Sequence, residues 1–313
     1  MASYCDAMAS QSYVDLRRAL DDPRTDPQLL FHQACELSGA FVRNEHLIGL
    51  LPPDAPHVMI AGFERAGGAG VADAYVELAA LYVTGGTWQS PLLPLDDARA
   101  IDLYRRAIAA GSDEAPYLLS RAIYRADRTD VAHEAWRKAK AFQVTHPDRL
   151  DALVHAGYLL QAGFGVPENQ EAAGDFFTEA AGRGSADGAF EVSVRSLNGV
   201  GAAQDDQEAL RWSRRAAELG SSRAAYNLGA AYATGRYGLV RDPEESLRWY
   251  LRAAEQNHGM AAFTAGVMLL TGDGALRPDP PRAARLLSDA DYLLGEGTVD
   301  LRLGAMGLER PLG

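Results

Sequence analysis

Apolar and polar side chains alternate along this chain with the period of an α-helix, and turn residues interrupt the pattern at regular intervals. Glycines recur 36, 36 and 37 residues apart, at Gly163, Gly199, Gly235 and Gly272. In the clearest unit the pattern predicts a helix over 222–234, a turn over 235–242 and a second helix over 243–256. Such a repeat of helix, turn and helix is typical of an α-solenoid.

The starts of the second helices carry their own signal. Asparagine or aspartate recurs in the same register, at Asn169, Asp205, Asp242 and Asp279. Proline follows Asp242 and Asp279. An aspartate followed by proline starts a helix well, because the carboxylate accepts hydrogen bonds from free backbone N–H groups and proline has no N–H group that needs a partner. The sequence therefore predicts mostly helix and no sheet.

Each first helix carries an apolar residue, a small residue and a second large residue at positions i, i+1 and i+4, such as Leu228, Gly229 and Tyr232. These positions lie on one helical face, which a single repeat cannot bury, so neighbouring repeats must stack. Aromatic residues occupy one column of the second helices and are expected to bury about 150–250 Å² each. They are Phe176, Phe177, Trp212, Trp249 and Tyr250.

The chain resembles the Sel-one-like repeat (SLR) family, a relative of the tetratricopeptide repeats (TPR), in Ala225-Tyr226-Asn227-Leu228-Gly229, Tyr232, Gly235, Asp242, Trp249-Tyr250 and Ala253-Ala254-Glu255. Weaker units begin near Asp151, Ala186 and Met260. An earlier unit has a turn lengthened by Trp88 to Leu95, and in residues 113–148 Arg125 replaces the turn glycine. The resemblance implies an all-α, right-handed α-solenoid of about six to seven helix-turn-helix repeats of 36–37 residues.

We expect four segments along the chain. Residues 1–26 form an N-terminal arm and capping helix, 27–71 a degenerate first repeat, 72–297 the SLR/TPR-like repeats and 298–313 a C-terminal cap.

Composition excludes several classes of protein. The 42 acidic and 30 basic residues give a net charge of -12, which argues against nucleic-acid binding because phosphates require clustered Lys and Arg. Two cysteines, Cys5 and Cys35, exclude a disulfide-dense scaffold. Only two of the basic residues are lysines, which with abundant alanine indicates a bacterial coding sequence. The N-terminus lacks signal-peptide features and no apolar run is long enough to span a membrane, so we expect a cytoplasmic protein.

No motif predicts catalysis. The seven histidines form no HExxH motif and none lies beside a cysteine, so we expect no metal and no cofactor. Residues 67–70 are glycine-rich but lack the lysine of a phosphate-binding loop. Asp96 and Asp205 are expected to cap second helices. His155 is expected to be a packed or a solvated histidine, and Cys35 to act as a small apolar residue.

We therefore predict a non-catalytic adaptor or scaffold that binds a protein partner, a peptide or a domain, in the concave groove of the solenoid. The resemblance also implies an alternative, an immunity or inhibitor protein that neutralises a cognate toxin. The acidic charge would suit a basic target. A hydrolytic enzyme on a repeat scaffold is a third alternative.

In TPR-like solenoids the first helices build the concave wall, and we expect exposed residues two positions before and two positions after Leu228 of the Leu-Gly pair and at the same columns of the other repeats. Aromatic and Arg side chains are favoured interface anchors. The predicted partner-binding residues are Tyr117, Arg121, Tyr124, Arg125, Val154, Tyr158, Phe190, Val194, Tyr226 and Phe263. Alternatively, Phe190 and Phe263 pack against the next first helix. We expect Tyr117→Ala and Arg121→Ala each to weaken binding by about 1–3 kcal/mol and to leave the melting temperature nearly unchanged.

Overall fold

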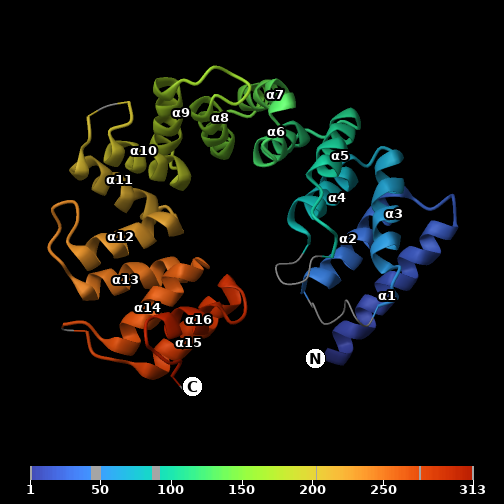
Figure 1. Ribbon diagram of the computed structural model, residues 1–313. Coiled ribbons are helices and arrows are strands. Elements are labelled where there is room, and N and C mark those ends of the chain that lie inside the picture. The colour runs from blue at the N-terminus through green and yellow to red at the C-terminus, as the bar shows by residue number, and fades with distance from the viewer. Residues whose placement is uncertain (1, 44–50, 87–91, 202, 275, 312–313) are drawn as a thin grey trace. The chain divides into compact units, whose positions relative to one another are not determined.

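The computed structural model describes residues 2–43, 51–86, 92–201, 203–274 and 276–311, and these residues form α-helices joined by turns and short loops (Figure 1). No strand occurs within the described ranges; a single isolated bridge joins Asp273 and Leu276. The prediction of an all-α repeat fold is therefore confirmed. The lengthened turn predicted at Trp88 falls partly on residues 87–91, outside the described residues.

The chain divides into two compact units, each described here by itself. Unit 1 comprises Met1–His146 with Gly163–Pro167, and unit 2 comprises Pro147–Ala162 with Glu168–Gly313. The elements of unit 1 are α1 (Ala2–Asp21), α2 (Pro27–Arg43), α3 (Ala55–Gly68), α4 (Ala72–Thr84), α5 (Asp97–Ala109), α6 (Ala115–Arg125), the 3-10 helix η2 (Thr129–Val131) and α7 (Ala132–Thr145). Those of unit 2 are α8 (Leu150–Ala162), α9 (Gln170–Gly182), α10 (Ala186–Asn198), α11 (Asp206–Glu218), α12 (Ser222–Thr234), α13 (Pro243–Ala254), α14 (Gly259–Thr271), α15 (Pro280–Leu294) and α16 (Thr298–Ala305).

Within each unit, every helix packs against the next helix in the chain. In the described residues, successive helices pair into hairpins whose number agrees with the six to seven repeats predicted. The hairpins are α2/α3, α4/α5 and α6/α7 in unit 1 and α8/α9, α10/α11, α12/α13 and α14/α15 in unit 2. The helix predicted over 222–234 matches α12, and the helix predicted over 243–256 ends two residues earlier, at Ala254. The division into an N-terminal arm, repeats and caps stays a prediction.

The predicted capping residues do cap helices. Asp242 has an extended backbone, and its carboxylate accepts hydrogen bonds from the N–H groups of Glu244 and Glu245 at 3.1 and 3.0 Å. Asp96 and Asp205 cap α5 and α11 in the same way. At the C-terminal end of α12, Gly235 adopts the left-handed conformation, with φ of 71°. Local chemistry thus fixes the starts of α5, α11 and α13 and the end of α12.

The small residue of each first helix, Gly157 in α8 and Gly229 in α12, leaves a gap that a side chain of the second helix fills. We call this gap the notch. A methyl group on Gly157 would lie 2.6 Å from the ring of Phe177, and one on Gly229 would lie 2.7 Å from the ring of Tyr250. Both rings are buried, as predicted, whereas Trp249 is only half-buried. Glycine therefore lets the two helices of a hairpin approach closely enough for the ring to fill the space between them.

Candidate functional site

The predicted partner-binding residues are divided between the two units. Tyr117, Arg121, Tyr124 and Arg125 belong to α6 in unit 1. Val154, Tyr158, Phe190, Val194, Tyr226 and Phe263 belong to the first helices of unit 2.

In unit 1, the predicted exposure of Tyr117 is wrong. Its side chain is 3% exposed and its ring stacks on Phe142 of α7, with ring centroids 5.3 Å apart. Arg121 is exposed, as predicted, and its guanidinium lies 5.6 Å from the Tyr117 ring. Tyr117 is therefore part of the core between α6 and α7, and Arg121 is the residue of this pair that solvent reaches.

The other two residues of α6 hold local structure. The half-buried Tyr124 contacts Phe164 edge-on, with centroids 5.2 Å apart, and burial raises the pKa of its hydroxyl. Arg125 donates a hydrogen bond to the backbone oxygen of Val83 at 2.6 Å and pairs with Asp97. In the place of the usual turn glycine, Arg125 thus ties α6 to α4 and α5.

In unit 2, the equivalent positions of the first helices α8, α10, α12 and α14 form a surface that we call the first-helix row. Side-chain contacts described below link α8 to α10, α10 to α12 and α12 to the start of α14. The exposed or half-buried residues of the row are Tyr158, Asp187, Val194, Arg223, Tyr226, Asn227, Ala230, Thr264 and Val267, and the buried Glu191 lies among them.

Three predicted residues of unit 2 are buried, so their predicted exposure is wrong. Phe190 lies beneath Arg223 of α12, whose guanidinium is 4.3 Å from the ring centroid. Phe263 packs with Val299 of α16, and Arg302 lies 5.9 Å from its ring. Val154 occupies the same column on α8, which contacts α10. Phe190 is thus covered by the next first helix, α12, and Phe263 by α16, which follows the last repeat. This fits the alternative in which both residues pack against the next first helix.

A polar cluster crosses α8, α10 and α12. The Tyr158 hydroxyl donates a hydrogen bond to Glu191 Oε1 at 2.6 Å, and burial, followed by this contact, raises the pKa of Tyr158. Arg223 donates to Asp187 at 2.9 Å and lies 3.7 Å from Glu191 Oε1. Glu191 is only 8% exposed. These contacts hold four polar side chains in fixed positions along the row.

The row continues toward α14 through aromatic contacts. Tyr226 of α12 stacks on His258, with centroids 4.7 Å apart, and packs against Tyr250 at 5.4 Å. His258 caps α14, because its Nδ1 accepts the N–H of Ala261 at 3.2 Å. Burial lowers the pKa of His258, which keeps the ring neutral and able to accept this hydrogen bond.

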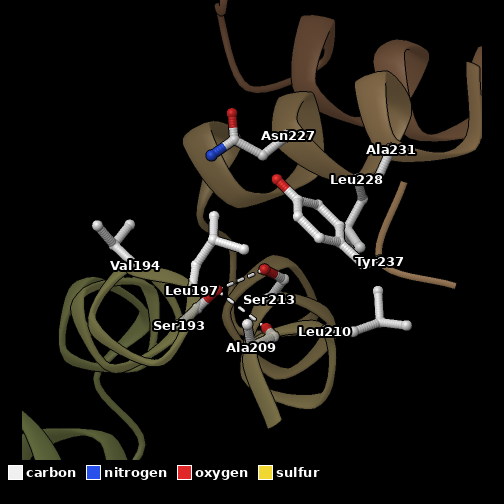
Figure 2. Close-up of a pocket in the computed structure, with 10 residues that line it drawn as sticks. All are labelled: Ser193, Val194, Leu197, Ala209, Leu210, Ser213, Asn227, Leu228, Ala231 and Tyr237. Carbon is white, nitrogen blue, oxygen red and sulfur yellow. Dashed lines mark hydrogen bonds between the residues drawn. The ribbon is translucent and has the colours of Figure 1, made fainter. Parts of the chain in front are cut away.

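A small cavity lies where the notch pattern changes. In the α10/α11 hairpin, Ser193 replaces the notch glycine and Ser213 replaces the aromatic residue; their hydroxyls are 2.6 Å apart, and Ser193 also donates to the Ala209 backbone oxygen at 2.9 Å (Figure 2). The cavity of about 20 Å³ that remains is lined also by Asn227 and Tyr237. This is room for one water molecule and not for an organic substrate.

The structure places the histidine and the cysteine singled out in the sequence. His155 is buried, which selects the packed histidine of the two alternatives. Burial, followed by the charges of Glu77 and Glu36, raises the pKa of Cys35 to about 12, whereas a nucleophilic cysteine needs a lowered pKa. Within the part of the chain that the structure describes, no group of three His, Cys, Asp or Glu residues could hold a metal ion.

The sequence analysis missed Asp187, Glu191, Arg223 and His258. One signal was present: Asp187 and Arg223 are 36 residues apart, so residues of opposite charge occupy the same column of consecutive repeats. Stacked repeats bring such residues together, as the Arg223–Asp187 ion pair shows. The role of His258 had no comparable signal, because histidine is not a usual helix cap.

Comparison with known proteins identifies the repeat. A family model described as Sel1 repeat matches residues 72–112, 150–185, 186–221, 222–258 and 259–297. Residues 113–149, between the first and second matches, contain the irregular unit with Arg125. No curated protein matches the chain.

Solved structures share the fold. A Sel1 repeat protein from Oxalobacter formigenes is 23% identical over 95% of this chain and 85% of its own, with a TM-score of 0.51. Immunity protein Pa5087 from Pseudomonas aeruginosa is 19% identical over 71% of this chain and 81% of its own, at 0.50. The protective antigen c5321 of uropathogenic Escherichia coli is 20% identical over 95% of this chain, at 0.48, and this chain spans 64% of it. At these identities the likeness to the Oxalobacter and Pseudomonas proteins shows the fold alone.

Proposed function

Because the chain belongs to the Sel1 repeat family, we propose that it is a non-catalytic scaffold that binds a protein partner along the first-helix row of unit 2. The Sel1/TPR-like repeat fold is typical of protein-interaction scaffolds. The observation that carries the proposal is the set of side-chain contacts between successive first helices, from Tyr158 through Glu191 to Arg223. They hold polar groups at the surface before any partner arrives, which lowers the entropy lost on binding.

The size of the row also favours a macromolecular partner. A specific interface buries about 800 Å² on each partner, and a surface spread over four helices can supply such an area. The cavity of Figure 2 is about 20 Å³, and a hollow of about 510 Å³ lined by Asn198, Gln204 and Tyr237 is largely open to solvent. Tyr226 and Arg223 belong to residue types that often carry binding energy.

The test is to change the row without changing the fold. Asn227 is exposed on α12, and Asn227→Arg would place a long charged side chain in the middle of the row. The matched control is Ser288→Arg, an exposed position on the second helix α15. We expect proteins captured from the native cell by the intact chain to be lost with Asn227→Arg and retained with Ser288→Arg. Equal capture by both variants would contradict the proposal.

A second candidate is an immunity or inhibitor protein. It is supported by the structural likeness to immunity protein Pa5087 and by the net charge of -12, which suits a basic target. The test is co-expression with a toxin encoded beside its gene: the chain would protect the cell, and Asn227→Arg would remove protection. A partner from a signalling or secretion apparatus would favour the scaffold.

The cellular setting is part of the same proposal. In the described residues, no helix combines the length and apolar character needed to cross a membrane. A cytoplasmic location and a bacterial source are proposed from the composition, which includes two cysteines and two lysines in the whole sequence.

A further inference from the structure

The first-helix row continues onto α16, which presents an arginine at its end. We propose that Arg302 of α16 binds an acidic side chain, aspartate or glutamate, of the protein partner, and that a neighbouring apolar side chain of the partner packs on Met260 and Leu301. This inference rests on the function proposed above and specifies the chemistry that the partner presents at this end of the row.

The first argument is a contact that occurs twice along the row. Arg223 of α12 covers Phe190 of α10, with its guanidinium 4.3 Å from the ring centroid. Arg302 of α16 covers Phe263 of α14 in the same manner, at 5.9 Å. Phe190 and Phe263 occupy the same column, two repeats apart. The short helix α16 thus follows α14 in the row as a further first helix would, and Arg302 is the residue that faces the row.

The second argument compares the charges at the two ends, and at the α10 end they cancel. Asp187 and Glu191 are the carboxylates there, and Arg223 pairs with them at 2.9 and 3.7 Å. Arg195, buried one helical turn after Glu191, adds a second positive charge. Two carboxylates therefore face two guanidinium groups, and this end of the row selects neither a basic nor an acidic partner group.

At the α14 end the arginine has no such carboxylates. Two repeats after Asp187 and Glu191, the same columns hold Met260 and Thr264. Helix α14 contains no Asp, Glu, Lys or Arg. In the part of the chain that the structure describes, Arg302 contacts the Phe263 ring and forms no ion pair. The contact between arginine and phenylalanine is thus repeated without its counter-charge, which a partner can supply.

The carboxylates nearest in the chain are engaged elsewhere or point away. Asp291 and Asp300 both pair with Arg310, at 3.1 and 2.8 Å. Residues two positions apart on a helix point about 200° apart, so Asp300 points away from Arg302 on α16, and Asp289 points away from Asp291 on α15. The exposed acidic residues outside the helices are Glu296 and Glu309, and within the described residues neither pairs with Arg302.

The third argument is the apolar surface beside the charge. Leu301 is 77% exposed, and Met260 is half-buried in the cluster that contains Phe263. A free anion would gain only an exposed ion pair, which is worth little, whereas a protein segment also buries these apolar side chains. The net charge of -12 does not oppose the contact, because charges more than about 8 Å apart are largely screened at physiological ionic strength.

The probe for the test is a phage-displayed library of random peptides, selected on the intact chain. Selected peptides that no longer bind Asn227→Arg are synthesised with an amidated C-terminus, so that side chains carry every carboxylate. We expect these peptides to share an aspartate or a glutamate next to an apolar residue. Arg302→Gln should weaken their binding about fivefold or more, because glutamine is polar but carries no charge.

A paired substitution separates the ion pair from a packing role of Arg302. Replacing the acidic residue of the peptide by its amide should weaken binding to wild type by a similar factor and leave binding to Arg302→Gln nearly unchanged, because two partners of one contact are not additive. The matched control Arg285→Gln changes an exposed arginine on the second helix α15 and should leave peptide binding unchanged. Circular dichroism and melting temperature should match wild type for both variants, because both arginines are exposed.

The outcomes distinguish the two proposals. Three results overturn the acidic side-chain proposal and leave the scaffold proposal standing: peptides that need the row but share no acidic residue, peptides that bind Arg302→Gln as tightly as wild type, and losses from the two substitutions that simply add. Failure of the library to yield any peptide that depends on the row contradicts both.

Discussion

Replacing Gly157 with alanine probes the notch in which the Phe177 ring packs. The added methyl carbon would lie 2.6, 2.9 and 3.0 Å from three carbon atoms of that ring. Contacts below 3.0 Å require a shift of one partner. Phe177 is 0% exposed and therefore cannot move its ring into solvent. The expected response is a small separation of α8 and α9.

The net effect is the difference between two opposing contributions. Alanine favours a helix over glycine by about 1 kcal/mol, whereas overpacking a well-filled core costs about 1–3 kcal/mol. We therefore expect Gly157→Ala to lower the free energy of unfolding by up to about 2 kcal/mol. The matched control is Gly182→Ala in α9, where a methyl group meets nothing within 4 Å. This variant should raise the free energy of unfolding by about 0.5–1 kcal/mol.

The assay is urea denaturation followed by circular dichroism, with hydrogen exchange used to assign the transition that contains α8 and α9. Opposite signs for the two alanine variants are expected. The reasoning about the notch would be refuted if Gly157→Ala stabilised the protein as much as Gly182→Ala, because the helix preference alone would then account for both.

The remaining predictions concern the core, a cap and pH. Tyr117→Ala should lower the free energy of unfolding by about 3 kcal/mol or more because Tyr117 is buried against Phe142, while Arg121→Ala should leave it within about 0.5 kcal/mol; comparable denaturation midpoints would contradict this. Asp242→Ala removes a cap that accepts two backbone N–H groups and should cost about 1 kcal/mol, which Asp242→Asn should largely restore. Burial lowers the pKa of His258 in the folded state below that of the unfolded chain. The stabilising contribution of His258 is therefore complete above about pH 6.5 and is lost as the pH falls through the folded-state pKa. His258→Asn should lose less stability than wild type between neutral pH and about pH 5, and equal losses would argue against the cap.

The repeat was predictable because it depends on local chemistry. The positions of Gly235 and Asp242 mark a helix end and a helix start through backbone conformation and capping, which a sequence displays directly. The notch at Gly229 follows from residue size within one helix pair. These features gave the all-α fold and the bounds of α12 from the chain alone.

Exposure along the first helices was less predictable because it depends on contacts made by later repeats. The same column holds Tyr226, which is half-buried, and Phe190, which Arg223 covers. Phe263 is buried because α16 packs on it, and α16 lies outside the regular repeats. Whether a position is open thus depends on side chains one repeat away. The partner-binding role of the predicted residues stays a prediction, and the burial of Tyr117 removes the reason to expect an unchanged melting temperature for Tyr117→Ala.

The serine pair of the α10/α11 hairpin also affects how unit 2 deforms. Where a ring fills a notch, as at Gly157, the two helices cannot slide past each other unless the ring is withdrawn. Ser193 and Ser213 are joined by a hydroxyl contact beside a cavity of about 20 Å³, and such a contact can be exchanged for water without moving a large group. We therefore expect the α10/α11 hairpin to resist sliding less than the α8/α9 hairpin, where the Phe177 ring fills the notch. Because α10 carries Asp187 and Glu191, such a displacement would change the spacing between the charged and the aromatic parts of the first-helix row.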